Sequence, residues 1–351
     1  MENKVATITF HWATNYGAVL QSYALQQFLL KHLYKTEIIN YVPEKRNFFY
    51  MLKKVMKGQS SLLVKEKKLK KFRKKHLLIS KEVKNLEELS LYSEQYNTII
   101  CGSDQIWNPY FTLHGAEDGT SNLSYFLDFA QNKTKKIAYA CSFGTETIPQ
   151  EMELLIRPCL SSFYRLSVRE QSGQSILNSL GLPSVLVLDP TMLLNKDDYL
   201  SLISKKKAKK DYAFVYILHD DKTSMVKICE LIKTKSNLNI VKNFNNSDSI
   251  EKWLSDIYFS DIVFTNSFHG MVFSIIFHKT FFILPTKNQG MMDRIKTLLS
   301  KLHLEQLIID SSNINVNDKI EINWESVDQI LSQLKDDSIS YLLNSLGNNV
   351  A

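Results

Sequence analysis

The chain is predicted to be an α/β protein with two doubly wound, Rossmann-like domains that face a cleft. Short apolar runs typical of buried parallel strands alternate with helical segments on both sides of a lysine-rich stretch, residues 204–210. The 351 residues exceed the length that one hydrophobic core usually serves. Polar residues gather directly after the apolar runs, at the edge where open α/β sheets bind ligands.

The N-terminal half opens with a strand–helix–strand unit, expected at residues 5–10, 18–32 and 37–41. Further elements of this half are expected as strands at 98–101, 136–141, 165–168 and 184–188 and as a helix at 149–162. Residues 1–203 are therefore predicted to form an N-terminal domain, with a basic helical insertion at about 50–80.

The C-terminal half repeats the alternation. Its strands are expected at 212–218, 239–242, 261–264 and 281–284, and its helices at 223–233, 249–255 and 270–277. We predict a second α/β domain over 211–323, joined to the first by the linker 204–210. A C-terminal helix, with apolar residues partly in helical phase over 324–345, and a tail complete the chain to residue 351.

Composition bounds the class of protein. Hydrophobic residues make up 44% and charged residues 23%, which is ordinary for a soluble globular protein. The four cysteines, Cys101, Cys141, Cys159 and Cys229, show no paired spacing, which favours reduced thiols. No signal peptide and no membrane span is recognisable, so a cytoplasmic protein is expected.

The net charge of +7 is unevenly distributed. Residues 53–76 hold eleven lysines and arginines, interleaved with leucine, valine and phenylalanine, which predicts a basic amphipathic helix. Such a helix suits an anionic membrane surface or a polyanionic acceptor, and the alternative is a solvated face over buried leucines. No nucleic-acid motif accompanies the charge, so no nucleic-acid partner is expected.

The stretch from Phe264 to Gly270, Phe-Thr-Asn-Ser-Phe-His-Gly, is the most informative in the chain. It carries Asn266, Ser267 and His269 from an apolar strand into a predicted helix. Helix starts favour anions, and a histidine there can bind an anion or move a proton. The alternative is a satisfied core histidine that caps the helix.

Polar residues follow the strands of the first half in the same way. The candidates are Asn15, Tyr16, Gly17, Ser103, Asp104, Gln105, Arg169 and Glu170. Asn15 and Asp104 have an alternative role as helix N-caps, and Gly17 as a residue that permits a tight turn.

Two arginines are candidates for binding an anion. Arg169 follows a buried strand, where a guanidinium requires a carboxylate or a phosphate. Its partner is either a ligand or an internal carboxylate, Glu170 or Asp189. Arg294 is expected to open a helix after a loop, and its alternative is a surface ion pair with Asp293 or Glu305.

Several chemistries lack their motifs. The sequence contains no GxGxxG, GxxxxGK[ST], HExxH or GxSxG pattern, no Asp-x-Asp and no close His/Cys cluster. Nicotinamide oxidoreductases, P-loop kinases, zinc hydrolases and serine hydrolases are therefore unsupported, and neither a cofactor nor a metal is expected.

Five motifs in order resemble the polysaccharide pyruvyl transferase family: residues 15–25, 102–108, 167–170, 188–191 and 267–270. The resemblance extends over about residues 5–300. It implies a fold similar to the GT-B glycosyltransferases and transfer of a pyruvyl group from phosphoenolpyruvate to sugar hydroxyls, as a ketal with loss of phosphate. The implied acceptor is a bacterial surface glycan, such as exopolysaccharide or capsule, or its lipid- or nucleotide-linked precursor.

This chemistry assigns roles to the candidates. His269 is expected to contact phosphate or transfer the proton, with Asp104 or Glu170 as the complementary base. The expected donor-binding residues are Arg169, Arg294, Asn266, Ser267, His269 and Gly270. The expected acceptor-binding residues are Asn15, Tyr16, Gly17, Ser103 and Gln105.

One position departs from the family pattern. Many members carry an arginine where this chain has Ser267, so Arg169 or Arg294 is expected to supply that charge.

Two other functions compete with pyruvyl transfer. The first is a metal-independent GT-B glycosyltransferase that uses a nucleotide sugar, although residues 261–300 contain only two acids, Asp261 and Asp293. The second is a non-catalytic scaffold in glycan assembly, for which Ser267 is the sole hint and against which His269, Arg169 and Asp104 argue.

Overall fold

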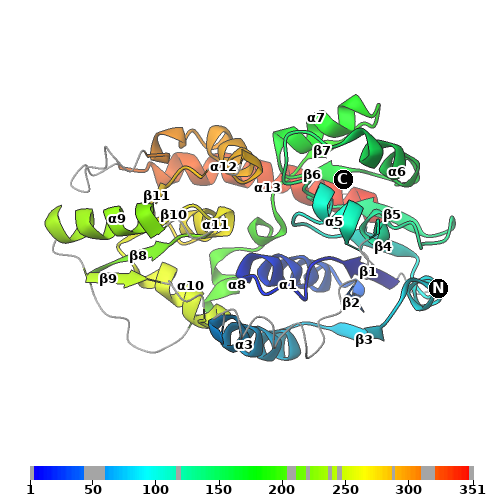
Figure 1. The fold of residues 1–351 in the computed structure, drawn as a ribbon, viewed down its shortest axis with the longest axis horizontal. Coiled ribbons are helices and arrows are strands. Elements are labelled where there is room, and N and C mark those ends of the chain that lie inside the picture. The colour runs from blue at the N-terminus through cyan, green and yellow to red at the C-terminus, as the bar shows by residue number, and fades with distance from the viewer. Residues whose placement is uncertain are drawn as a thin grey trace. The chain divides into compact units, whose positions relative to one another are not determined.

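A computed structural model describes residues 4–42, 60–115, 120–203, 211–218, 222–235, 239–242, 247–286, 289–309 and 321–347. The chain divides into two compact units (Figure 1). Unit 1 comprises Met1–Gly58, Lys71–Leu194 and Gln333–Ala351, and unit 2 comprises Gln59–Lys70 and Asn195–Ser332.

Unit 1 is built on a five-stranded parallel sheet of order β3-β2-β1-β4-β5. Its strands are β1 (Lys4–Ile8), β2 (Lys35–Tyr41), β3 (Ile79–Val83), β4 (Thr98–Cys101) and β5 (Lys135–Ala138). In the central strand β1, Ala6 pairs with Glu37 on one side and Ile99 on the other. Every residue of β4 is buried, as expected for a short apolar strand covered on both faces.

A small parallel pair extends this arrangement. It consists of β6 (Ser167–Val168) and β7 (Val185–Leu186), and single bridges join Ile137 to Arg165 and Cys141 to Val168. The helices of unit 1 are α1 (Tyr16–Lys31), α4 (Leu86–Ser93), α5 (Pro109–His114), α6 (Gln150–Ser161) and α7 (Gln171–Ser179). Two 3-10 turns, η1 (Ser124–Phe126) and η2 (Pro190–Met192), also belong to it.

Unit 2 has a four-stranded parallel sheet of order β11-β10-β8-β9. Its strands are β8 (Tyr212–Tyr216), β9 (Asn239–Lys242), β10 (Ile262–Thr265) and β11 (Thr280–Ile283). Its helices are α8 (Lys196–Leu200), α9 (Lys222–Lys235), α10 (Ile250–Phe259), α11 (Phe268–Ile276) and α12 (Gln289–Lys301), with the turn η3 (Glu305–Leu307). The indole of Trp253 is buried here, edge-on to Tyr216 and Phe273.

The predicted α/β class, with two parallel sheets each flanked by helices, is confirmed, and five of the ten predicted strands are one to three residues shorter than expected. The change from unit 1 to unit 2 occurs between Leu194 and Asn195, ahead of the predicted boundary at residue 203. The difference arises because α8 packs in unit 2, where Tyr199 meets Phe273 at a ring-centroid distance of 5.0 Å. The predicted linker 204–210 lies outside the described residues.

Two further helices correspond to helices predicted from the sequence. Helix α3 (Ser60–His76) is the predicted basic helix, and residues 53–59 of the basic region lie outside the described residues. Helix α13 (Trp324–Leu346) covers the predicted C-terminal helix. Its start belongs to unit 2, where Trp324 stacks on His278, and its end belongs to unit 1, where the Tyr341 hydroxyl donates to the Ala138 carbonyl.

Two further expectations, on the cysteines and on membrane-spanning helices, can be compared with this structure. Cys101, Cys141, Cys159 and Cys229 are all free thiols, as predicted. Among the described helices, none combines the length and the apolar character that crossing a membrane requires.

Candidate active site

Each sheet has one point at which the strand order reverses, between β1 and β4 in unit 1 and between β8 and β10 in unit 2. Ligands of open α/β sheets bind outside the carboxyl ends of the strands at such points. A threonine hydroxyl joins the paired strand ends in both units: Thr9 donates to the Ser103 carbonyl at 3.0 Å, and Thr265 donates to the Tyr216 carbonyl at 2.6 Å. The predicted site residues divide between these two places.

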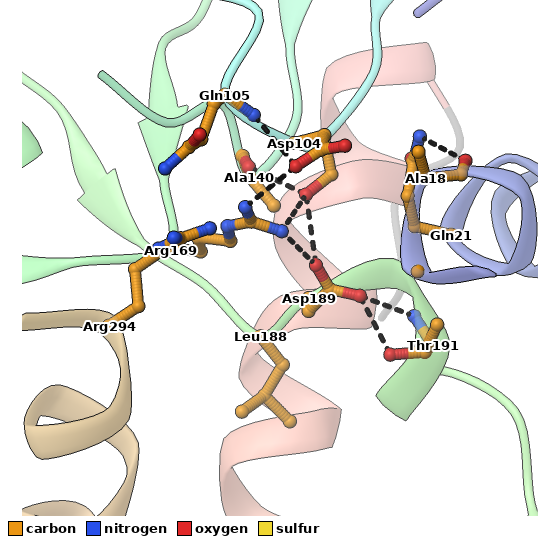
Figure 2. Close-up of polar contacts among 12 residues, drawn as sticks. Ala18, Gln21, Asp104, Gln105, Ala140, Arg169, Leu188, Asp189, Thr191 and Arg294 are labelled. Atoms are coloured by element: carbon orange, nitrogen blue, oxygen red, sulfur yellow. Dashed lines mark hydrogen bonds and ion pairs between the residues drawn. The ribbon is translucent and has the colours of Figure 1, made fainter. Parts of the chain in front are cut away.

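In unit 1, Arg169 lies at the centre of a buried ionic cluster directly after β6 (Figure 2). Its Nη1 is 2.6 Å from Asp189 Oδ2, and its Nη2 is 3.2 Å from Asp104 Oδ1. Glu170 Oε2 lies 3.7 Å from Arg169 Nε. The internal alternative for Arg169 is therefore present, and it involves Asp104 as well as the two carboxylates named from sequence.

Hydrogen bonds from short polar side chains hold this cluster together. Ser103 Oγ accepts from Arg169 Nη1 at 3.2 Å and lies within donating distance of Asp189 Oδ2 and the Ala140 carbonyl. Asp189 Oδ1 accepts from both the backbone N–H and the hydroxyl of Thr191. Both oxygens of Asp189 are thus bonded, which fixes the carboxylate that faces Arg169 (Figure 2).

The charges of the cluster do not balance, since one guanidinium faces three carboxylates. Burial alone lowers the pKa of Arg169, but Asp189, Asp104 and Glu170 outweigh burial and raise that pKa above its ordinary value. The surroundings of Arg169 are therefore acidic, which opposes binding of a further anion.

Asp104 differs from the other two carboxylates in backbone and exposure. Its φ of +82° lies in the left-handed region, which is uncommon for residues other than glycine and in which aspartate is enriched. Its Oδ1 accepts from the Gln105 N–H at 2.9 Å, and 17% of its side chain is exposed. Asp104 is the carboxylate of this cluster that solvent reaches.

Glu170, in contrast, has a side chain only 1% exposed. Its Oε1 accepts from the Phe143 N–H at 3.0 Å, so it holds the loop that follows β5. In the same loop, a Cβ on Gly144 would come within 2.4 Å of Gln105 Nε2. The absence of a side chain at Gly144 therefore leaves room for Gln105 beside Asp104.

The three predicted residues at the start of α1 have structural roles. Asn15 is exposed, and its Oδ1 accepts from the N–H groups of Gly17 and Ala18 at 2.8 and 3.3 Å. This is the N-cap role given as its alternative. Tyr16 and Gly17 are buried in the first turn of α1.

His11, which the sequence did not single out, lies on the loop after β1. Its Nδ1 is 3.1 Å from the Thr9 carbonyl and its Nε2 is 3.3 Å from Asn40 Oδ1. Burial lowers the pKa of His11 to about 4, so the ring is neutral near pH 7. The available signal was its position directly after a central strand.

In unit 2, the turn between β10 and α11 is tightly built. Ser267 is the N-cap of α11, with its Oγ accepting from the Gly270 N–H at 3.3 Å. A Cβ on Gly270 would come within 2.6 Å of Thr265 Oγ1, so glycine is required for this close approach of helix and strand. The Ser267 N–H donates to the same Thr265 oxygen at 3.0 Å.

Asn266 connects the two strand ends at the reversal point of unit 2. Its Oδ1 accepts from the Leu218 N–H at 2.7 Å, and its Nδ2 donates to the Leu218 carbonyl at 3.1 Å. Since both ends of the amide are bonded to backbone, Asn266 fixes the loop after β8.

His269 and Arg294 meet around one aromatic ring. His269 is in the first turn of α11, and its ring is edge-on to Phe268 with centroids 5.3 Å apart. The guanidinium carbon of Arg294 lies 5.9 Å from the centre of the Phe268 ring, and Nε donates to the Gly290 carbonyl. Both side chains are buried.

The position of Arg294 corrects one expectation. It lies in the second turn of α12 and does not open that helix. The start of α11 offers helix-start N–H groups and the imidazole of His269. Arg294 adds a guanidinium beside Phe268. These are the groups that bind a phosphate or a carboxylate.

No group of three or more histidine, cysteine, aspartate or glutamate side chains in the described ranges is arranged to hold a metal ion.

Comparison with known proteins gives one family. The sequence model of the family described as polysaccharide pyruvyl transferase matches residues 15–288, which include every candidate named from sequence except Arg294. No curated protein matches the chain significantly.

Several solved structures share the fold of this chain at low sequence identity. A putative UDP-N-acetylglucosamine 2-epimerase from Listeria monocytogenes superposes with a TM-score of 0.54 at 10% identity, over 100% of this chain and 98% of the other. The S. aureus MnaA–UDP structure gives 0.53 at 12% identity over 99% and 97%. The UDP-GlcNAc 2-epimerase from Methanocaldococcus jannaschii gives 0.51 at 11% identity over 95% and 99%. At these identities the likeness concerns the fold, which is GT-B-like as predicted.

Proposed function

Because the chain belongs to the polysaccharide pyruvyl transferase family, we propose that it transfers the pyruvyl group of phosphoenolpyruvate to sugar hydroxyls of a surface polysaccharide or its precursor. The product is a pyruvate ketal. The observation that carries the proposal is the grouping of His269 and Arg294 at the start of α11.

Phosphoenolpyruvate is a small dianion or trianion, in which the carboxylate and the phosphate ester are both attached to C2. Its binding site therefore requires fixed positive charge and N–H donors. The start of α11 supplies backbone N–H groups and the positive end of the helix dipole, and Arg294 supplies a guanidinium. Unit 2 is accordingly the donor side.

The reaction joins one donor to two hydroxyls of one sugar. A proton adds to the methylene carbon, which becomes the methyl group, and the first hydroxyl oxygen bonds to C2 as its proton leaves. The C2–O bond to phosphate then breaks, and the second hydroxyl oxygen takes that position. Of the two hydroxyl protons released, one balances the proton on the methyl group and the other leaves with inorganic phosphate.

His269 is the residue we assign to phosphate contact or to proton transfer at the donor. An imidazole can serve either purpose. Ser267, Gly270 and Asn266 shape the turn that presents it.

Arg294, and not Arg169, is the guanidinium we assign to the donor. Three carboxylates surround Arg169 and repel an incoming anion. In our proposal Arg294 supplies the charge that many family members carry at the position of Ser267. Arg169 then serves to position Asp104.

Asp104 is the residue we assign to accepting the proton of the acceptor hydroxyl. It is partly exposed, whereas Glu170 is buried against the Phe143 N–H. Gln105 and the exposed Asn15 are the remaining reachable candidates for acceptor contact. Ser103, Tyr16 and Gly17 are buried and support that side from within.

Thermal stabilisation of the purified protein tests the donor. A ligand that binds only the folded state raises the melting temperature by mass action, so phosphoenolpyruvate should raise it and UDP-sugars should not. His269→Ala should lose the rise, whereas His303→Asn, at an exposed histidine with positive φ, should keep it.

Stabilisation by a UDP-sugar alone would contradict the proposal and indicate a nucleotide-sugar glycosyltransferase instead. That alternative is compatible with the fold of the UDP-bound MnaA structure, although the family match favours pyruvyl transfer.

A further inference from the structure

Helix α3 carries a net charge equal to that of the whole chain. Between Ser60 and His76 there are eight lysines and arginines and one acid, Glu66, a net charge of +7, and the full chain also has +7. The remainder of the chain is therefore neutral overall. This concentration of charge takes no part in the proposed reaction.

One face of α3 is buried in the protein. Leu69 and Phe72 are almost fully buried, and the Phe72 ring meets Tyr23 at a centroid distance of 5.9 Å. Arg73 is also buried, with its Nη1 3.5 Å from the Trp12 carbonyl. These apolar side chains are occupied by packing and are not available to insert into another apolar phase.

The opposite face is a row of exposed lysines. Lys67, Lys70, Lys71, Lys74 and Lys75 follow one another at helical spacing and are all exposed; we call them the lysine stripe. Eight residues of helix separate the first from the last, so the stripe is about 12 Å long. Within the described residues none of the five forms an ion pair.

This arrangement destabilises the isolated helix. Lys67 and Lys71, Lys70 and Lys74, and Lys71 and Lys75 are like charges four residues apart, which repel on a helix surface. An external anionic surface would relieve that repulsion.

We propose that the lysine stripe adsorbs α3 lengthwise onto an anionic lipid bilayer. Lysine ammonium groups act as compact point charges, which suits the diffuse negative charge of a lipid surface. Clusters of basic residues are attracted to the negative surface potential of anionic bilayers. The contact is electrostatic because Leu69 and Phe72, the apolar residues interleaved with the lysine stripe, are already packed. A nucleic-acid surface is less suited, because no recognisable nucleic-acid-binding motif accompanies the stripe.

The contribution of the stripe is expected to be large at low salt. A lysine near an anionic bilayer strengthens binding about fivefold, so five together give on the order of a thousandfold. The effect should diminish steeply as the Debye length shortens from about 30 Å at 0.01 M salt to about 8 Å at 0.15 M.

Co-sedimentation with vesicles tests the proposal on the full chain. Wild-type protein should bind phosphatidylcholine vesicles that contain phosphatidylglycerol at low salt, and should not bind pure phosphatidylcholine vesicles. Changing all five stripe lysines to glutamine lowers the net charge from +7 to +2 and should weaken binding at least a hundredfold. Changing them to arginine should preserve binding.

A matched control separates the effect of the lysine stripe on vesicle binding from the effect of net charge. Lys31, Lys84, Lys133, Lys233 and Lys296 are exposed lysines elsewhere, and changing these five to glutamine gives the same net charge. This control should bind within about threefold of wild type. Equal weakening in both variants would reduce the effect to net charge and overturn the proposal.

Two further results would also overturn it. One is wild-type protein that does not bind anionic vesicles at low salt. The other is binding of duplex DNA as tight as that of anionic vesicles at the same salt concentration. Neither result depends on pyruvyl transfer, so failure here and failure of the proposed reaction are distinguishable.

Discussion

The two sheet ends differ in electrostatics although they share a topology. In unit 1 a guanidinium lies among three carboxylates and is bonded internally. In unit 2 a guanidinium and an imidazole lie beside a helix start. The sequence signal of polar residues after apolar strands pointed to both sheet ends, although Arg294 was named separately, as a residue expected to open a helix. The comparison teaches that the signal locates polar strand ends, while the charges around them differ and cannot be read from the signal itself.

The largest expected effect breaks the unit 1 cluster. Asp189→Ala removes the closest partner of Arg169 and the cap of η2, and should lower the free energy of unfolding by about 3 to 5 kcal/mol. Chemical denaturation measures it. Asp197→Ala, an exposed acid nearby in sequence, should change stability by no more than about 0.5 kcal/mol. A small loss in Asp189→Ala would mean that Arg169 does not depend on this carboxylate.

The next effect is a loss of stability at low pH, caused by His11 at the carboxyl end of the central strand of the same sheet. The unfolded chain protonates His11 below its ordinary pKa of 6.5, whereas the folded chain protonates it only below about 4. Protons therefore favour the unfolded state, and stability attributable to His11 should fall by roughly 3 kcal/mol as pH drops from 7 toward 4.

Denaturation of His11→Gln across that pH range checks this expectation. Glutamine keeps a polar side chain but does not titrate, so the variant should lose less stability than wild type between pH 6.5 and 4. Arg73 and Asn40 face the ring and are unchanged in both proteins. Parallel curves for the two proteins would contradict a buried neutral histidine.

The smallest stability effect tests the turn of unit 2. Gly270→Ala puts a Cβ within 2.6 Å of Thr265 Oγ1, which is itself bonded to the Tyr216 carbonyl. Overpacking of this kind costs about 1 to 3 kcal/mol. Ser274→Ala, at a buried site one turn later on α11, is the comparison because it removes atoms without adding a clash. Thermal unfolding that ranks Ser274→Ala as the more damaging change would argue against the close approach.

Much of the fold could be predicted because the strands are short apolar runs buried on both faces. The runs at 98–101 and 239–242 were assigned to the residue. Strand β3, with the sequence Ile-Ser-Lys-Glu-Val, was not assigned, because as an edge strand it carries exposed charge and lacks an apolar run. Helix α7 was missed because its polar sequence, Gln-Ser-Gly-Gln-Ser, gives little helical signal before Ile176.

The contacts among the candidate site residues could not be predicted from the sequence as well as the places of these residues along the chain. Asn15 was predicted from sequence to be an acceptor contact, with a helix cap as its alternative role, and the structure shows that it caps α1. The contacts of Arg169 with Asp104 and Asp189 join residues 65 and 20 positions apart. No local pattern encodes such pairs, since they depend on which strands are neighbours. The same is true of Arg294 and Phe268, which come from different helices.

Calorimetric titration with phosphoenolpyruvate tests most directly whether the donor binds in unit 2. Arg294→Gln should weaken binding about ten- to a hundredfold, because a hydrogen bond to a charged group contributes about 1.5 to 3 kcal/mol. Asp104→Asn removes one negative charge beside Arg169 and should leave the affinity unchanged. If the donor were bound at Arg169, Asp104→Asn would tighten binding and Arg294→Gln would have no effect, and that result would contradict the assignment.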